Sequence, residues 1–231
     1  MSNLIVIGQG DSRLNLEEAV ELYKMRWGGI VKAELGITDD RGLTARLIRQ
    51  QSSRVKAFPE GQIAVIDGFT KEVYATIYSL LIGTSQLPEI RGWNHLTGYG
   101  TGKTHNPKGD NLICYAIQST GKVIGATSAL INAQKELANS LGTGLLVFTR
   151  PDGLRRYAKK EGMSLDHPDI KKYLDAKING TTTQYDGVSF HLRHGATLAP
   201  FLKGGKPYLT NSRPGDVNSL GFNVLMEYAV R

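Results

Sequence analysis

The sequence predicts a mixed α/β fold in which helices flank one central β-sheet. Two observations carry this prediction. The run Asn111–Gln118 alternates apolar residues with the period of a strand, and it leads through a turn holding Gly121 and Gly125 into a helix. The apolar residues of that helix recur every three or four positions from Leu130 to Leu141. Strand and helix patterns continue on both sides of this unit, an order typical of a mixed sheet in one domain over residues 1–231.

The segments ahead of this unit are predicted as a strand and two helices. Asn3–Ile7 has the pattern of a short strand. Asn15 and Glu18 have the spacing of a capping box and begin a helix with apolar residues at helical spacing, and Gly28 and Gly29 weaken its middle and are its candidate end. A second helix is predicted over Leu43–Gln51, followed by a loop over Arg54–Gly61.

Later segments alternate between strands, loops and short helices. Gln62–Asp67 and Glu72–Ile82 flank an Asp-Gly pair, which predicts an antiparallel hairpin. The stretch Gly83–Asp110 is long and rich in Gly, Thr and Pro, so a functional loop is expected there. The remaining elements are a buried strand over Leu145–Thr149, short helices over Leu154–Glu161, Asp169–Ala176 and Val188–His194, and strands over Thr197–Leu202 and Phe222–Val230.

Composition places the chain among soluble globular proteins. Of its 231 residues, 40% are hydrophobic and 21% charged, which is ordinary for a protein with a substantial core. No apolar run reaches the length of a membrane helix, and the first residues lack the pattern of a signal peptide. The single cysteine, Cys114, excludes an internal disulfide, so the expected location is the cytoplasm, away from membranes.

The net charge of +7 indicates an anionic partner. Nucleic acid, a phosphorylated cofactor and an acidic protein surface all meet this condition. The sequence has no zinc-finger spacing, no RNP-like motif and no long basic tract, so no nucleic-acid partner is expected. His95, His105 and His167 supply no recognisable third ligand beside His191 and His194, so no metal is expected either.

The turn with Gly121 and Gly125 has the composition of an anion site. Unpaired backbone N–H groups converge at a helix N-terminus, where the helix dipole favours a phosphate. Glycines also occur at strand-to-helix turns for geometry alone, and the sequence leaves both interpretations open.

The order of elements resembles the GNAT acyltransferase fold, in which acyl-CoA straddles a splayed pair of central strands. In that family the pyrophosphate loop commonly reads Gln/Arg-x-x-Gly-x-Gly/Ala, and Thr120–Gly125 occupies the corresponding place. Thr120 stands where the family has Gln or Arg, and Val123 stands at the first glycine. The resemblance implies an acyl-CoA site, with malonyl-CoA or acetyl-CoA as substrate, at Ile117, Gln118, Thr120, Gly121, Lys122, Val123, Ile124, Gly125 and Ala126.

Further motifs resemble two branches of that superfamily. GNAT domains fused to nitrilase-like hydrolases are matched by Phe58-Pro59-Glu60-Gly61-Gln62, Trp93-x-His95-x-Thr97-Gly98 and Thr104-His105-Asn106-Pro107-x-Gly109-Asp110. The GNAT-like domains of curacin-type polyketide synthase loading modules are matched by Phe148-Thr149-Arg150, Phe190-His191-x-x-His194-Gly195-Ala196 and Arg213-Pro214-x-Asp216-x-Asn218. These motifs cover most of residues 58–231, expected to be the GNAT core, and leave 1–57 as an N-terminal helical region without a match.

The resemblance to loading domains implies decarboxylation of a malonyl-type thioester, with transfer of acetyl to a carrier-protein thiol as a further step. It places the reaction on Thr149 and His191, with the motif's arginine at Arg213. Loss of carbon dioxide leaves an enolate, and each fixed donor to its oxygen contributes about 3 kcal/mol by analogy with oxyanion holes. Thr149 and His191 would be such donors, and Arg213 would hold the free carboxylate. The ordinary histidine pKa of about 6.5 would also let His191 return a proton to carbon.

Two other functions stay open at this point. The first is N-acylation of a small-molecule amine, for which Glu60, Asp67 and Tyr157 are available as acid or base. The second is a non-catalytic GNAT-derived scaffold, which Thr120 and Val123 favour. The acceptor is therefore an acyl carrier protein or a small molecule, and the sequence does not indicate the oligomeric state.

Overall fold

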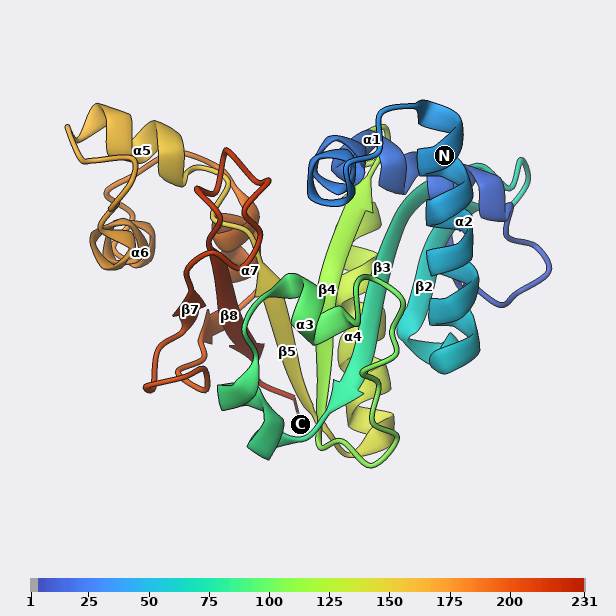
Figure 1. The fold of residues 1–231 in the computed structure, drawn as a ribbon. Coiled ribbons are helices and arrows are strands. Elements are labelled where there is room, and N and C mark those ends of the chain that lie inside the picture. The colour runs from blue at the N-terminus through green and yellow to red at the C-terminus, as the bar shows by residue number, and fades with distance from the viewer. Residues whose placement is uncertain (1–3, 231) are drawn as a thin grey trace.

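One eight-stranded sheet runs through the molecule in the computed structural model, which describes residues 4–230 (Figure 1). The strand order is β1-β2-β3-β4-β5-β8-β6, with β7 paired to β8. Every pairing is antiparallel except β4 with β5, which is parallel. The strands are β1 Leu4–Gly8, β2 Gln62–Asp67, β3 Val73–Ile82, β4 Asn111–Ser119, β5 Gly144–Thr149, β6 Ala196–Leu198, β7 Tyr208–Leu209 and β8 Asn223–Tyr228.

The two central strands separate part-way along their length, as expected. β4 and β5 pair from Asn111 with Gly144 to Cys114 with Val147, and then diverge. Figure 1 shows the resulting opening between the upper ends of β4 and β5. Side chains replace part of the lost pairing, because Trp93 Nε1 donates to the Tyr115 carbonyl at 3.0 Å. The backbone pairing of the sheet is therefore interrupted between β4 and β5 beyond Cys114 and Val147.

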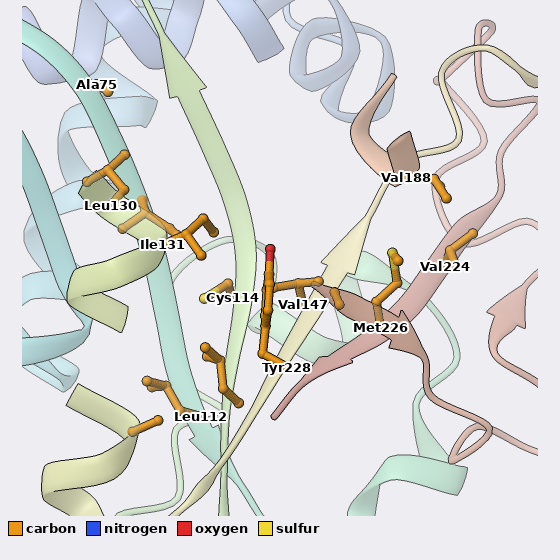
Figure 2. Packing of buried hydrophobic residues seen from close by; sticks show 14 of the residues in the cluster. Ala75, Leu112, Cys114, Leu130, Ile131, Val147, Val188, Val224, Met226 and Tyr228 are labelled. Atoms are coloured by element: carbon orange, nitrogen blue, oxygen red, sulfur yellow. The ribbon is translucent and has the colours of Figure 1, made fainter. Parts of the chain in front are cut away.

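Helices cover both faces of the sheet. α4 (Ala126–Leu141) packs on one face, where its Leu130 and Ile131 join Leu112, Cys114 and residues from several strands in one apolar cluster (Figure 2). The first three helices cover the other face, where their apolar side chains pack with Ile113 and Tyr115 of β4. The helices are α1 Leu16–Leu35, α2 Asp40–Ala57, α3 Trp93–Thr97, α4 Ala126–Leu141, α5 Leu154–Lys160, α6 Ile170–Ile178 and α7 Gly187–Arg193, with 3₁₀ turns at Pro59–Gly61 and Thr84–Glu89.

The early elements are present, but their ends differ from the predictions. α1 continues through Gly28 and Gly29 to Leu35, and the helix predicted over Leu43–Gln51 is Asp40–Ala57. Asn15 caps α1 by accepting from the N–H groups of Glu17 and Glu18, and the strand expected at Asn3–Ile7 is β1, whose Asn3 lies outside the described residues. The loop predicted over Arg54–Gly61 is wrong at its start, because α2 continues to Ala57. The buried guanidinium of Arg54 stacks on tyrosine rings and donates to the Gly100 carbonyl at 2.6 Å, and these tertiary contacts extend the helix.

The C-terminal strands differ from prediction in length. The strand expected over Thr197–Leu202 is only Ala196–Leu198, and the loop expected between the terminal strands contains β7. β7 has two residues and is formed by pairing with β8 rather than by its own pattern. Among residues 4–230, no helix combines the length and the apolar character that a membrane crossing needs.

Candidate active site

The three predicted catalytic residues line one inner cavity at the opening between β4 and β5. Thr149 ends β5, His191 lies in α7, and Arg213 lies in the loop between β7 and β8. The cavity has a volume of about 70 Å³, and all three residues are buried. The tertiary structure thus brings together residues up to 64 positions apart in the sequence (213 minus 149).

A hydrogen bond to a buried tyrosine orients the His191 ring. Its Nδ1 lies 2.8 Å from the hydroxyl oxygen of Tyr228, at the end of β8. Figure 2 shows the Tyr228 ring beside Cys114 and Val147. Burial, and to a smaller extent His194, lowers the pKa of His191 to about 3. The expectation based on an ordinary histidine pKa is therefore wrong, and the imidazole is neutral at pH 7.

Thr149 is fixed from both sides by close neighbours. Its carbonyl accepts a hydrogen bond from Asn223 Nδ2 at 3.1 Å, while its hydroxyl makes no hydrogen bond to another described residue. Gly187, the first residue of α7, approaches so closely that an added Cβ would lie 2.5 Å from Thr149 Oγ1. The hydroxyl is therefore clamped beside the start of the helix that carries His191.

Arg213 lies between two indole rings. Its guanidinium carbon is 4.0 Å from the ring centroid of Trp93 and 5.1 Å from that of Trp27. Its Nε donates to Glu34 Oε1 at 3.1 Å, and within residues 4–230 its buried Nη2 has no hydrogen-bond partner. Stacking and one ion pair orient the fork and leave one of its terminal nitrogens available for a planar anion.

The N-terminal helix supplies residues that the sequence analysis did not assign to the site. Arg26 and Trp27 of α1 line the inner cavity, and Trp27 Nε1 donates to Gln118 Oε1 at 3.0 Å. Arg150, next to Thr149, stacks 4.9 Å from the Trp27 ring and is ion-paired to buried Asp216. Burial opposes ionisation of Asp216, but the hydrogen bonds from Arg150 outweigh it and lower its pKa. Arg150 and Asp216 were present in the quoted motifs, whereas no sequence signal linked Trp27 to them.

An outer groove of about 470 Å³ leads from the inner cavity along β4 to α4. It shares with the cavity Arg26, Ile117, Asp152, Gly187 and His191, and it continues past Ser119 to Thr127 in the first turn of α4. Ile117 and Gln118 are the members of the expected acyl-CoA set that line it. The Gln118 side chain is bound to Trp27 and Thr76, so it anchors α1 to the sheet.

The remaining residues of the expected set form the turn after β4 and the first position of α4. Gly121 and Gly125 have positive φ, with open space around an added Cβ, and α4 has no side chain capping its first N–H groups. Val123 packs against the apolar cluster beneath α4, while Ile124 is fully exposed. Thr120 Oγ1 accepts from the Lys122 N–H, and the Lys122 ammonium pairs with Glu72. The uncapped helix start and the inward-packed Val123 are compatible with a phosphate at this turn.

Comparison with solved structures identifies the fold. The chain superposes over 99% of its length on a GNAT-like decarboxylase, GphF, in complex with isobutyryl-CoA, with a TM-score of 0.65 and 19% identity over 100% of that chain. The chain has the GNAT fold. It also superposes over 98% of its length on 98% of the loading GNATL domain of CurA from Lyngbya majuscula, with a TM-score of 0.67 and 18% identity. An aminoglycoside 6'-N-acetyltransferase in complex with coenzyme A superposes on 98% of this chain over 97% of its own length, with a TM-score of 0.54 and 12% identity.

Comparison of the sequence alone with protein families and curated proteins does not identify relatives. No protein-family model matches the chain, and no curated protein matches it significantly. The GNAT fold, expected from the order of elements, is confirmed by the superpositions. The expected splay of the central strands is confirmed by the pairing of β4 with β5, which ends at Cys114 and Val147. No group of three or more His, Cys, Asp or Glu side chains suited to a metal ion occurs in the part of the chain that the structure describes.

The buried neutral imidazole predicts a pH-dependent stability. The unfolded chain takes up a proton at His191 below a pH of about 6.5, whereas the folded chain does so only near its pKa of about 3. Unfolding therefore binds a proton in this window, and the free energy of unfolding falls as the pH is lowered through it. We expect the wild type to lose about 2–3 kcal/mol more than His191→Gln between pH 7 and pH 4.5, by urea unfolding. Equal losses in both proteins would contradict the buried neutral state.

Proposed function

We propose that this protein decarboxylates a small malonyl-type thioester, carried by CoA or by an acyl carrier protein. The observation that carries the proposal is the convergence of Thr149, His191 and the stacked Arg213 on one buried cavity. A hydroxyl, an imidazole and a guanidinium at one point are suited to a substrate with a thioester carbonyl and a free carboxylate. The small volume of the cavity favours a short acyl chain.

The outer groove supports a route for the thioester arm. CoA would lie with its pyrophosphate at the turn Thr120–Gly125, where the uncapped start of α4 offers N–H groups. Its pantetheine arm would follow β4 past Ile117 and Gln118 into the cavity. GphF has been solved with isobutyryl-CoA, and the acetyltransferase with coenzyme A, which supports an acyl-CoA ligand in this fold.

The proposed step breaks one carbon–carbon bond. The malonyl C–C bond to the carboxylate breaks, carbon dioxide leaves, and the electron pair moves to the thioester oxygen as an enolate. Thr149 Oγ1 and His191 Nε2 donate hydrogen bonds to that oxygen. We assign the imidazole proton to Nε2, because burial raises the pKa of Tyr228 and its retained hydroxyl proton is donated to Nδ1. A proton then reaches carbon from water, and an acetyl thioester results, because the neutral imidazole keeps its only proton on Nε2.

Arg213 has a separate role in the proposal. Its fork would hold the malonyl carboxylate and set the angle between the breaking bond and the plane of the thioester. The carboxylate loses its charge during the reaction, so this ion pair contributes more to binding than to the rate of the chemical step.

Transfer of acetyl to a carrier-protein thiol would follow by attack of the thiolate on the thioester carbonyl, with CoA thiol as the leaving group.

N-acylation of an amine is the second candidate function, favoured by the superposition on an aminoglycoside 6'-N-acetyltransferase. Its proposed acid and base groups are less well placed. Glu60 is exposed next to β2, Asp67 accepts from turn N–H groups in the β2–β3 hairpin, and Tyr157 packs on Tyr173. None of these three residues is among those that line the inner cavity. Cys114 does line it, but burial raises the pKa of its thiol to about 12, so it is not a nucleophile at pH 7.

Mass spectrometry of thioesters incubated with the protein tests the proposal. We expect malonyl-CoA to become acetyl-CoA, and an acetylated carrier to appear if a carrier thiol is present. Unchanged malonyl-CoA together with acetyl-CoA consumed only when amines are supplied would establish N-acylation instead. A ligand that binds the folded state must stabilise it. The absence of both turnover and any change of melting temperature with CoA thioesters would therefore indicate a non-catalytic scaffold.

Selective binding of the carboxylate gives a further prediction. We expect malonyl-CoA to raise the melting temperature more than acetyl-CoA at the same concentration, because of the ion pair with Arg213. Arg213→Lys keeps a cation near Glu34 but loses the planar fork, and it should reduce the malonyl-specific increase while leaving the acetyl-CoA increase intact. Differential scanning fluorimetry measures both, with each protein carrying His191→Ala so that malonyl-CoA is not consumed during the scan. Equal shifts for the two ligands in the His191→Ala protein with Arg213 intact would show that Arg213 does not bind the carboxylate.

A further inference from the structure

A second groove, which we call the α5 groove, adjoins the mouth of the outer groove. It has a volume of about 460 Å³ and is lined by Asp152, Arg155, Arg156, Lys159, Gln184, Tyr185 and Asn218. Two of these residues, Asp152 and Tyr185, also line the outer groove. In Figure 1, α5 lies at the same end of the sheet as the diverging ends of β4 and β5. A molecule in the α5 groove would therefore stand next to the path into the cavity.

The wall of this groove is mainly basic, because three of its lining residues are Arg155, Arg156 and Lys159. The α5 sequence, Leu-Arg-Arg-Tyr-Ala-Lys-Lys, has four cations and no acid. Leu154, Tyr157 and Ala158 are buried, whereas Arg156, Lys159 and Lys160 are exposed. Within the described chain, none of these cations forms an ion pair with a carboxylate, in contrast to Arg26, Arg150 and Arg213 around the cavity.

The α5 groove and the expected phosphate site are formed by different residues. The turn Thr120–Gly125 joins β4 to α4, and no residue of β4, of this turn or of α4 lines the α5 groove. CoA with its pyrophosphate at the start of α4 would leave the α5 groove free. The cations also continue along α5 beyond the groove to exposed Lys160. An extended acidic surface complements such a row of cations.

We propose that the α5 groove is the docking surface for an acidic carrier protein that presents the thioester on a flexible arm. This inference rests on the proposed function and adds where the partner binds. Acidic side chains of the partner would pair with Arg156, Lys159 and Lys160, and its arm would pass Asp152 and Tyr185 into the outer groove. Exposed charges of this kind raise the rate of association and its dependence on salt more than they deepen the bound state.

A charge-reversed pair tests the docking surface. The variant Arg156→Glu/Lys159→Glu changes two exposed residues of α5, and Lys103→Glu/Lys108→Glu changes two exposed lysines in the loop after α3 by the same charge. Three substrates are compared: malonyl-CoA, malonyl-pantetheine and an acidic acyl carrier protein loaded with a malonyl-phosphopantetheine arm. Binding of the labelled carrier is measured separately by fluorescence anisotropy at several salt concentrations.

We expect the α5 variant to lower kcat/KM for the carrier substrate by about tenfold and to weaken the salt dependence of carrier binding. The values for malonyl-CoA and malonyl-pantetheine should stay within about twofold, and the Lys103/Lys108 variant should match the wild type. An increased KM for malonyl-CoA but not for malonyl-pantetheine would show that the groove holds nucleotide phosphates and would overturn the proposal. Equal carrier kinetics and binding in all three proteins would overturn it as well.

The same experiment separates this inference from the proposed function. If no malonyl thioester is decarboxylated while the α5 variant still loses carrier binding, the docking proposal is supported and the proposed decarboxylase activity is refuted. If malonyl-CoA is decarboxylated but the wild type neither binds nor uses the carrier, the activity is supported and the docking proposal is refuted.

Discussion

Replacement of His191 with alanine is expected to lower kcat for malonyl-CoA decarboxylation by about a thousandfold. The proposed Nε2 donor to the enolate oxygen is lost, and removal of one oxyanion donor costs about a hundredfold to a thousandfold in kcat. KM should change little, because the donor acts mainly in the transition state. Steady-state kinetics with malonyl-CoA, followed by mass spectrometry of the product, measures both constants.

Two controls accompany this variant. His194 lies three residues further on, forms hydrogen bonds with Ser128 and the Phe190 carbonyl, and is not among the residues that line the inner cavity. His194→Ala should therefore keep kcat within a fewfold of the wild type. Tyr228→Phe leaves the imidazole in place but removes its partner at Nδ1, so we expect an intermediate loss. Full activity in His191→Ala would remove His191 from the mechanism.

Substitution of Gly187 with alanine is expected to lower kcat by about a hundredfold. The added Cβ would lie 2.5 Å from Thr149 Oγ1 and 2.8 Å from the Arg150 carbonyl oxygen, closer than unbonded atoms approach. Either the Thr149 hydroxyl or the start of α7 must move, and a displacement of about 1 Å in a reacting geometry costs about a hundredfold. The assay is the same, and the melting temperature is recorded alongside to measure the cost to the fold.

Gly29→Ala is the matched control for this substitution. Gly29 lies within α1, close in sequence to Trp27 of the site. A Cβ added at Gly29 has nothing within 4 Å. It should keep activity and stabilise the helix slightly. Because Gly187→Ala acts through Thr149, Thr149→Val should give a loss of similar size without crowding α7. Wild-type kcat in Gly187→Ala would show that the position of the Thr149 hydroxyl is not critical.

The local pattern of the chain predicted most of the elements and the neighbourhood of the site. The capping box at Asn15, the hairpin at Asp67 and the strand, turn and helix from Asn111 to Leu141 are all present. These features depend on interactions within a few residues, so they are visible without the fold. Where tertiary contacts decide, the pattern was insufficient: α2 extends to Ala57 because Arg54 is buried among tyrosines, and β7 exists because β8 is beside it.

The sequence by itself determined the types of the residues, the order of the elements and the resemblance that singled out Thr149, His191 and Arg213. Only the tertiary structure decided that they share a cavity, that Trp27 and Glu34 of α1 orient Arg213, and that Gly187 clamps Thr149. It also decided the charge of His191, because desolvation depends on the atoms around a group and not on its neighbours in the chain. Contacts between distant segments carry no local periodicity, and for that reason the N-terminal helix entered the site only through the fold.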